Sequence, residues 1–203
     1  NLNIVIINLF ANYFLYTNDV TFDYSKDGKM IIHRGVTEPW KVTIVDTGKE
    51  TMTGGRIKRI EPYVNGETFM MTYGDGVCDV NIAELLNFHK SHGKRATCTS
   101  VILQQDKGVL DISDIGAVRS FREKKYMDGI PINVGYMVFE PAVFDYLRDD
   151  TTILEQEPMN RLAKDGELMS YRHNGFWQCM DTLNEKRILE KLWETGNAPW
   201  KKW

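Results

Sequence analysis

Short apolar segments alternate with amphipathic segments along this chain. Apolar clusters of strand length predict strands over 3–7, 20–24, 30–33, 42–45, 69–72, 96–103, 117–123 and 135–139. Apolar residues three and four positions apart predict helices over 9–15, 54–64, 80–92, 152–163 and 183–193. Strands that alternate with helices are typical of an α/β fold with a mixed, mostly parallel sheet flanked by helices.

Turn and cap residues mark several of these boundaries. The turn Ser25-Lys26-Asp27-Gly28 separates two strands and predicts a hairpin. Thr53 is placed to cap the helix over 54–64, and Asp79 is placed to cap the helix that Gly93 ends. Residues 152–155 have the form of a capping box, which predicts a helix start there.

Composition narrows the class of protein. The 203 residues suit one domain with a large core, and we expect residues 1–203 to form it. A net charge of −3 gives no general attraction to nucleic acid or to a membrane surface. No apolar run reaches the roughly 18 residues that a membrane span needs. The three scattered cysteines match no zinc spacing, so a reduced, cytoplasmic setting is expected.

Two carboxylates follow strand-like segments. Asp75 lies in a Gly-Asp-Gly turn after 69–72, and Asp181 closes the aromatic segment 176–182. A carboxylate at the carboxyl end of a buried strand lies where open α/β sheets bind ligands. Two such carboxylates with open positions suit Mg²⁺, which keeps waters and takes ligands from phosphates. Taken alone, Gly-Asp-Gly is equally ordinary turn chemistry.

Two further segments carry candidate phosphate ligands. The start of a helix at 51–56 offers two glycines, free N–H groups and the forked donor of Arg56, although a capped helix with a surface arginine fits the same residues. Lys124 follows a strand and could neutralise a sugar phosphate, although its neighbours also fit an exposed charge run. His89 and His92 form a possible metal pair, but we favour a structural role because no third ligand is placed beside them.

Eight short motifs, in this order, together resemble the glucose-1-phosphate cytidylyltransferase family. Each motif alone is weak, but their order and spacing over nearly the whole chain are specific. The motifs are 45–48 (VDTG), 52–56 (MTGGR), 72–76 (TYGDG), 121–124 (FREK), 155–158 (EQEP), 166–168 (GEL), 176–182 (FWQCMDT) and 198–201 (APWK).

The resemblance implies a nucleotide-diphospho-sugar transferase fold, which is Rossmann-like. It also implies the reaction of CTP with α-D-glucose 1-phosphate to give CDP-glucose and diphosphate, with Mg²⁺ as cofactor. Carried over by position, Asp75 and Asp181 would hold the Mg²⁺ and, with Lys124, would form the catalytic group. The products of such enzymes supply dideoxysugar and O-antigen synthesis within lipopolysaccharide.

The resemblance also implies two binding groups. Thr51, Gly55, Arg56 and Gly74 would contact the nucleotide. Lys124 would meet the sugar phosphate, and Glu123 and Asn133 would meet the glucose hydroxyls.

Some parts of the family pattern have no counterpart in the printed sequence. The family begins with a strand and a Gly-rich loop containing Gly-Thr-Arg, whereas this sequence begins at what resembles the second strand. Its pattern is also altered near 104–106 and 124–126, and Cys179 stands where proline is usual. Either disordered loops are left out of the sequence or the chain is a fragment. We favour omission, because the differences cluster at ligand-facing loops.

Alternatives of two kinds stay open at this point. Within the class, a pyrophosphorylase that uses UTP or dTTP fits the same motifs. Outside it, a non-catalytic nucleotide-sugar sensor would fit a chain that truly lacks the Gly-rich loop. Exposed aromatic residues near the C-terminus, together with the family resemblance, predict a homo-oligomer.

Overall fold

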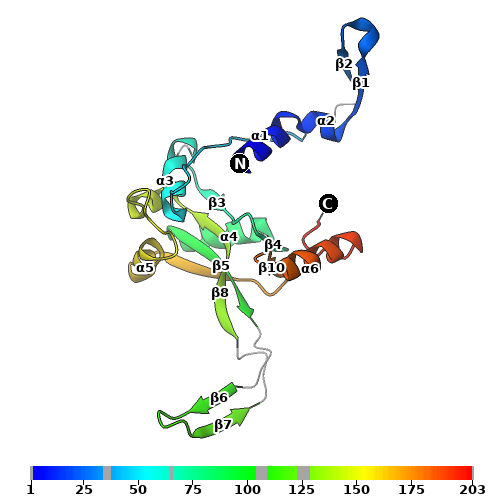
Figure 1. Cartoon of the computed structure of the whole chain (residues 1–203). Coiled ribbons are helices and arrows are strands. Elements are labelled where there is room, and N and C mark those ends of the chain that lie inside the picture. Colours follow the sequence, from blue (N-terminus) through cyan, green and yellow to red (C-terminus); the bar gives the residue numbers. More distant parts are fainter. Residues whose placement is uncertain (1, 34–37, 65, 104–108, 123–128, 203) are drawn as a thin grey trace. The chain divides into compact units, whose positions relative to one another are not determined.

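The computed structural model describes residues 2–33, 38–64, 66–103, 109–122 and 129–202 (Figure 1). The chain divides into two compact units, Asn1–Lys49 and Glu50–Trp203, and each is described by itself. The expectation of a single domain over 1–203 stays a prediction.

The unit Asn1–Lys49 contains two helices followed by a hairpin. These elements are α1 (Leu2–Ala11), α2 (Tyr13–Thr17), β1 (Asp19–Asp23) and β2 (Lys29–His33). The two strands pair antiparallel, with Asp19 opposite His33. Asp27 and Gly28 in the turn both have positive φ values, 55° and 71°. The predicted hairpin is therefore confirmed.

Two strands predicted for this unit are wrong. Residues 3–7 belong to α1, because an unbroken apolar run has no periodicity that separates a strand from a helix. Ile4 and Val5 are 56% and 63% exposed, so this segment is not buried either. Residues 42–45 are described without strand structure, and Val42 and Ile44 are both exposed.

A four-stranded sheet forms the centre of the unit Glu50–Trp203. Its strand order is β3 (Phe69–Met71), β8 (Ile130–Phe139), β5 (Ala96–Leu103) and β9 (Leu168–Arg172). β8 is antiparallel to both of its neighbours, and β9 is parallel to β5. Three of the four strands therefore run in one direction, with β8 reversed between them. The predicted mixed α/β sheet is confirmed, although only the β5–β9 pairing is parallel.

Alternate residues of β8 face opposite sides of this sheet. Met137 and Phe139 enter one apolar cluster, which also contains residues of α3 (Thr53–Val64), the 3-10 helix η3 (Pro141–Tyr146) and α5 (Glu157–Lys164). Val138 enters a second cluster with Leu85 of α4 (Ile82–His92). Helices therefore cover both faces, as the alternation of elements predicted.

Two antiparallel pairs accompany the central sheet. β4 (Gly76–Cys78) pairs with β10 (Trp177–Cys179), and α6 (Leu183–Glu194) follows β10 along the chain. β6 (Val109–Ile112) pairs with β7 (Val118–Arg122). The strand predicted over 117–123 and the helix predicted over 183–193 are confirmed to within one residue at each end.

Two predicted helix caps are wrong. The cap of α4 is Asn81, whose Oδ1 accepts hydrogen bonds from the backbone N–H groups of Ala83 and Glu84. Asp79 instead accepts a hydrogen bond from the backbone N–H of Phe176. The segment 152–155 forms no capping box, since α5 begins at Glu157.

Candidate functional site

The pairing of β4 with β10 brings together the backbone segments that carry the two predicted metal ligands. Cys179 lies opposite Gly76, and the backbone N–H of Met180 donates to the carbonyl oxygen of Asp75 at 2.8 Å. Asp75 takes part in the second of these contacts, and Asp181 is the residue directly after Met180. Both aspartates therefore lie at the same end of the strand pair. Both residues are exposed, which leaves their carboxylates open to a ligand.

Asp181 has a carboxylate and a thiol as further neighbours. One ligand atom each from Cys179, Asp181 and Glu185 lies within 4.8 Å of the others. Burial, and then hydrogen bonds to Asp181 and Glu185, raise the pKa of the Cys179 thiol to about 11. The thiol therefore stays protonated, and its neighbourhood offers oxygen ligands to a hard cation rather than a thiolate to a soft one.

Glu185 is a site neighbour that we did not predict. Its Oε2 accepts hydrogen bonds from the backbone N–H groups of Asp181 and Thr182 at 3.0 and 2.8 Å. With the Thr182 side chain it forms the capping box of α6, which fixes the backbone next to Asp181. The spacing Thr182-x-x-Glu185 carried this signal in the sequence.

The predicted nucleotide segment 51–56 packs tightly on a second segment, 150–154. Met52 N–H donates to Asp150 O at 2.8 Å, and Gly55 N–H donates to Thr152 O at 3.1 Å. A Cβ atom on Gly55 would lie 2.6 Å from the Asp150 Cα. The expectation of a free N–H on Gly55 is therefore wrong, because close packing already uses that group.

The other three predicted nucleotide ligands differ in their exposure to solvent. Thr51 is buried and Arg56 is exposed. Gly74 is exposed, and a Cβ atom there would meet open space. Their roles toward a nucleotide stay predictions.

Glu155 joins segment 51–56 to the turn that carries Asp75. Thr53 Oγ1 donates to Glu155 Oε2 at 2.7 Å, and the Tyr73 hydroxyl donates to Glu155 Oε1. Burial is the main cause that raises the Tyr73 pKa, followed by the hydrogen bond to Glu155. Tyr73 therefore remains a neutral donor directly before Gly74 and Asp75.

The predicted sugar group is described in part. The Asn133 Oδ1 accepts a hydrogen bond from Gly135 N–H at 3.0 Å, and Gly135 has a φ of 80°. Both residues lie in β8, and a Cβ atom on Gly135 would collide with the ring of Tyr73, so this part of the strand packs on that ring. Glu123 and Lys124 lie outside the described residues.

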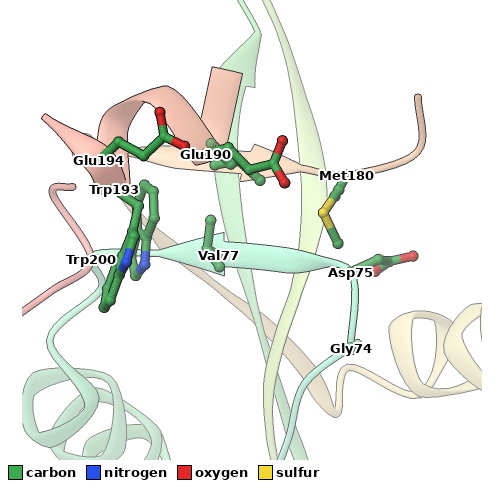
Figure 2. A pocket seen from close by; sticks show the side chains of 9 residues that line it. Gly74, Asp75, Val77, Met180, Glu190, Trp193, Glu194 and Trp200 are labelled. Carbon is green, nitrogen blue, oxygen red and sulfur yellow. The ribbon is translucent and has the colours of Figure 1, made fainter. Parts of the chain in front are cut away.

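A cavity of about 440 Å³ extends from Asp75 along β4 toward the last helix (Figure 2). Its lining combines apolar side chains with three carboxylates. It consists of Gly74, Asp75, Val77, Met180, Leu189, Glu190, Trp193, Glu194 and Trp200. Figure 2 shows both tryptophans near one end of β4 and Asp75 near the other. The sequence gave no signal that these two tryptophans would line a cavity with Asp75.

His89 and His92 hydrogen-bond α4 to neighbouring parts of the fold. His89 Nδ1 and His92 Nε2 both lie 2.8 Å from Thr97 Oγ1, and His89 Nε2 lies 3.0 Å from a Glu140 oxygen. All of the ring nitrogens named here already have protein partners. The structural role that we favoured for the pair is confirmed.

Among the described residues, no helix is both long enough and apolar enough to cross a bilayer. Cys78, Cys98 and Cys179 are free cysteines.

Comparison with known proteins finds no matching family model. The glucose-1-phosphate cytidylyltransferases of Salmonella typhi and Salmonella typhimurium are each 52% identical to this chain over 200 residues. These alignments cover 98% of the chain and 77% of each relative. The chain belongs to the glucose-1-phosphate cytidylyltransferase family.

A more distant member of the family supports this. The probable glucose-1-phosphate cytidylyltransferase of Bacillus subtilis is 41% identical over 195 residues, which are 96% of this chain and 75% of that relative. Identity on this scale extends across both units of the chain.

Solved structures agree in fold. A putative glucose-1-phosphate thymidylyltransferase from Bacillus anthracis matches with a TM-score of 0.51 at 14% identity over 77% of this chain. HddC from Yersinia pseudotuberculosis matches with a TM-score of 0.50 at 18% identity over 68%. The chain spans 64% and 60% of these two proteins. At such identities the likeness supports the nucleotidyltransferase fold alone.

Proposed function

We propose that the protein transfers a cytidylyl group from CTP to α-D-glucose 1-phosphate, giving CDP-glucose and diphosphate. The observation that carries this proposal is the 52% identity to glucose-1-phosphate cytidylyltransferases over 98% of the chain. The adjacent positions of Asp75 and Asp181 at one end of the β4–β10 pair support it.

The reaction needs no protein nucleophile. An oxygen of the sugar phosphate attacks the α-phosphorus of CTP in line, and the bond to the leaving diphosphate breaks as the new phosphorus–oxygen bond forms. The protein then has two tasks, which are to align the two substrates and to offset the negative charge of their phosphates.

The two aspartates fit the magnesium ion that this chemistry uses. Their carboxylates are exposed hard oxygen ligands on adjacent strand ends, and the neighbouring thiol is protonated. Bound there, Mg²⁺ would act as a Lewis acid toward the phosphate oxygens. Asp75 and Asp181 would hold it, and their own charges would be balanced by it.

The remaining roles divide between the two substrates. Thr51, Arg56 and Gly74 would contact CTP, with the Arg56 guanidinium as a forked donor to phosphate. Lys124 would neutralise the phosphate of glucose 1-phosphate, and Glu123 and Asn133 would bind glucose hydroxyls. For Asn133, the hydrogen bond that it accepts from Gly135, the residue packed against Tyr73, supports a position near the turn that carries Asp75.

Two properties complete the proposal. The free cysteines fit a reduced compartment such as the cytoplasm. The exposed side chain of Trp193, 49% accessible, fits the subunit contact of a homo-oligomer.

A diphosphate-release assay tests the proposed function. The intact protein is incubated with glucose 1-phosphate, Mg²⁺ and, in separate reactions, CTP, UTP or dTTP. Diphosphate release with CTP well above the other two supports cytidylyl transfer. Release with UTP or dTTP instead would assign a different pyrophosphorylase, and no release with any triphosphate would favour a non-catalytic sensor.

A further inference from the structure

We propose that Glu155 is a positioning residue, which fixes the start of α3 and the turn 73–75 relative to one another so that nucleotide and metal meet in one geometry. The proposal rests on the cytidylyl transfer proposed above and adds a residue that the reaction itself does not touch.

On one side, Glu155 holds the start of α3. Its Oε2 accepts from Thr53 Oγ1 at 2.7 Å, and the same Oγ1 accepts from Leu154 N–H at 2.9 Å. Thr53 is thereby fixed from two directions. It is the first residue of α3 and lies between Thr51 and Arg56, two of the proposed nucleotide ligands.

On the other side, Glu155 holds the turn that carries Asp75. Its Oε1 accepts from the Tyr73 hydroxyl, and the Tyr73 ring packs against the backbone of Gly135. Tyr73 is separated from Asp75 by a single glycine, which fixes no orientation by itself. The Tyr73 phenol therefore anchors the Asp75 turn on its N-terminal side, and the Tyr136 hydroxyl, which donates to Gly76 O at 3.1 Å, anchors it on the other side.

A carboxylate is suited to this position because both of its partners donate. Two hydroxyl donors need two acceptor oxygens, and an ionised carboxylate supplies them on one rigid group. A glutamine would keep the shape but offer only one carbonyl oxygen. Glu155 is also exposed, so water could satisfy it without either partner. The two hydrogen bonds of Glu155 therefore mainly fix the positions of Thr53 and Tyr73, and they bury little surface.

The kinetic test compares Glu155→Gln and Tyr73→Phe with Glu157→Gln in the intact protein. Glu157 is the matched control, since it is a carboxylate two positions along the chain that pairs with Arg148 and Arg161 instead. We expect Glu155→Gln and Tyr73→Phe to lower kcat about tenfold or more and to raise the Mg²⁺ concentration at half-maximal rate. The KM for glucose 1-phosphate should stay within about twofold, as should every constant of the control. The double variant should be no slower than the slower single variant, because both remove one linkage.

Hydrogen exchange gives a second readout that needs no activity. In Glu155→Gln, the backbone amides of both 53–56 and 73–76 should exchange faster than in the unaltered protein, while the melting temperature stays the same. In Glu157→Gln, their exchange should not change. Unchanged exchange, or a kcat loss that follows the melting temperature, would overturn the proposal. If the unaltered protein makes no CDP-glucose, the proposed function fails, and exchange still decides whether Glu155 links the two segments.

Discussion

At the scale of single residues, a hydrogen-bonded chain fixes the tautomers of both helix histidines. Lys94 N–H can only donate, so His92 Nδ1 accepts, at 2.9 Å, and His92 Nε2 must carry a proton toward Thr97. The Thr97 hydroxyl then donates to His89 Nδ1, and His89 Nε2–H donates to Glu140. Neutral imidazoles complete the chain, and a proton added to His92 Nδ1 would face another donor.

This arrangement predicts a loss of stability in mild acid. Burial is the main cause that lowers the pKa of His92, helped by His89 and Lys94. A lowered pKa means that the unfolded state binds the proton more readily, so stability falls as the pH drops below about 6.5, the ordinary value. The free energy of unfolding should therefore fall between pH 7.5 and 5.5. His92→Gln should reduce that fall, and an equal fall in both proteins would exclude His92 as a cause.

Lys124 is expected to bind the phosphate of glucose 1-phosphate through a charge-assisted hydrogen bond. One charge-assisted hydrogen bond is worth about 1.5–3 kcal/mol, or roughly a tenfold to hundredfold change in an equilibrium constant. Lys124→Ala should raise the KM for glucose 1-phosphate by about that factor and change the KM for CTP far less. Equal changes in both constants would argue against a role on the sugar side.

At the scale of elements, close packing explains residues that look like ligand residues in the sequence. Gly54 and Gly55 let α3 approach 150–154, where Cβ atoms would lie 2.8 Å from a Thr152 methyl carbon and 2.6 Å from the Asp150 Cα. Gly55→Ala should therefore lower stability by about 1–3 kcal/mol, measured by denaturant unfolding. Gly74→Ala, with open space around it, is the folding control. Similar stability in both variants would show that α3 can shift without cost.

The sequence predicted elements with strong local signals and missed those that depend on distant partners. The hairpin turn at 25–28 and the helix end at Gly93 could be predicted, because positive φ values there favour particular residues. The strand expected over 3–7 failed because apolar residues alone do not distinguish helix from strand. Asp79 failed as a cap because its partners, Phe176 and His173, lie nearly a hundred residues away.

The candidate site shows the same division. Asp75 and Asp181 were identified from motifs, and their adjacency follows from a β4–β10 register that local patterns do not contain. Glu155 appeared within a family motif and as part of a predicted capping box, and its linking contacts could not be predicted because they depend on Thr53 and Tyr73 in two other segments.

At the scale of the whole molecule, the central sheet and the β4–β10 pair together position the residues of the proposed chemistry in the unit Glu50–Trp203. β8 carries Asn133 and Gly135, whose backbone packs on Tyr73 beyond the end of β3. The β4–β10 pair then supplies both aspartates. We therefore expect these two aspartates to form one divalent metal site that CDP-glucose synthesis requires.

Electron paramagnetic resonance of Mn²⁺, a probe for the Mg²⁺ site, tests whether the two aspartates share one metal ion. The intact protein with CTP should bind one Mn²⁺ tightly. Asp75→Asn and Asp181→Asn should each weaken that binding about tenfold or more and abolish CDP-glucose formation, without loss of fold. Asp114→Asn, in the exposed turn of the β6–β7 hairpin, should change neither. Wild-type Mn²⁺ affinity in either Asp75→Asn or Asp181→Asn would contradict a shared metal site.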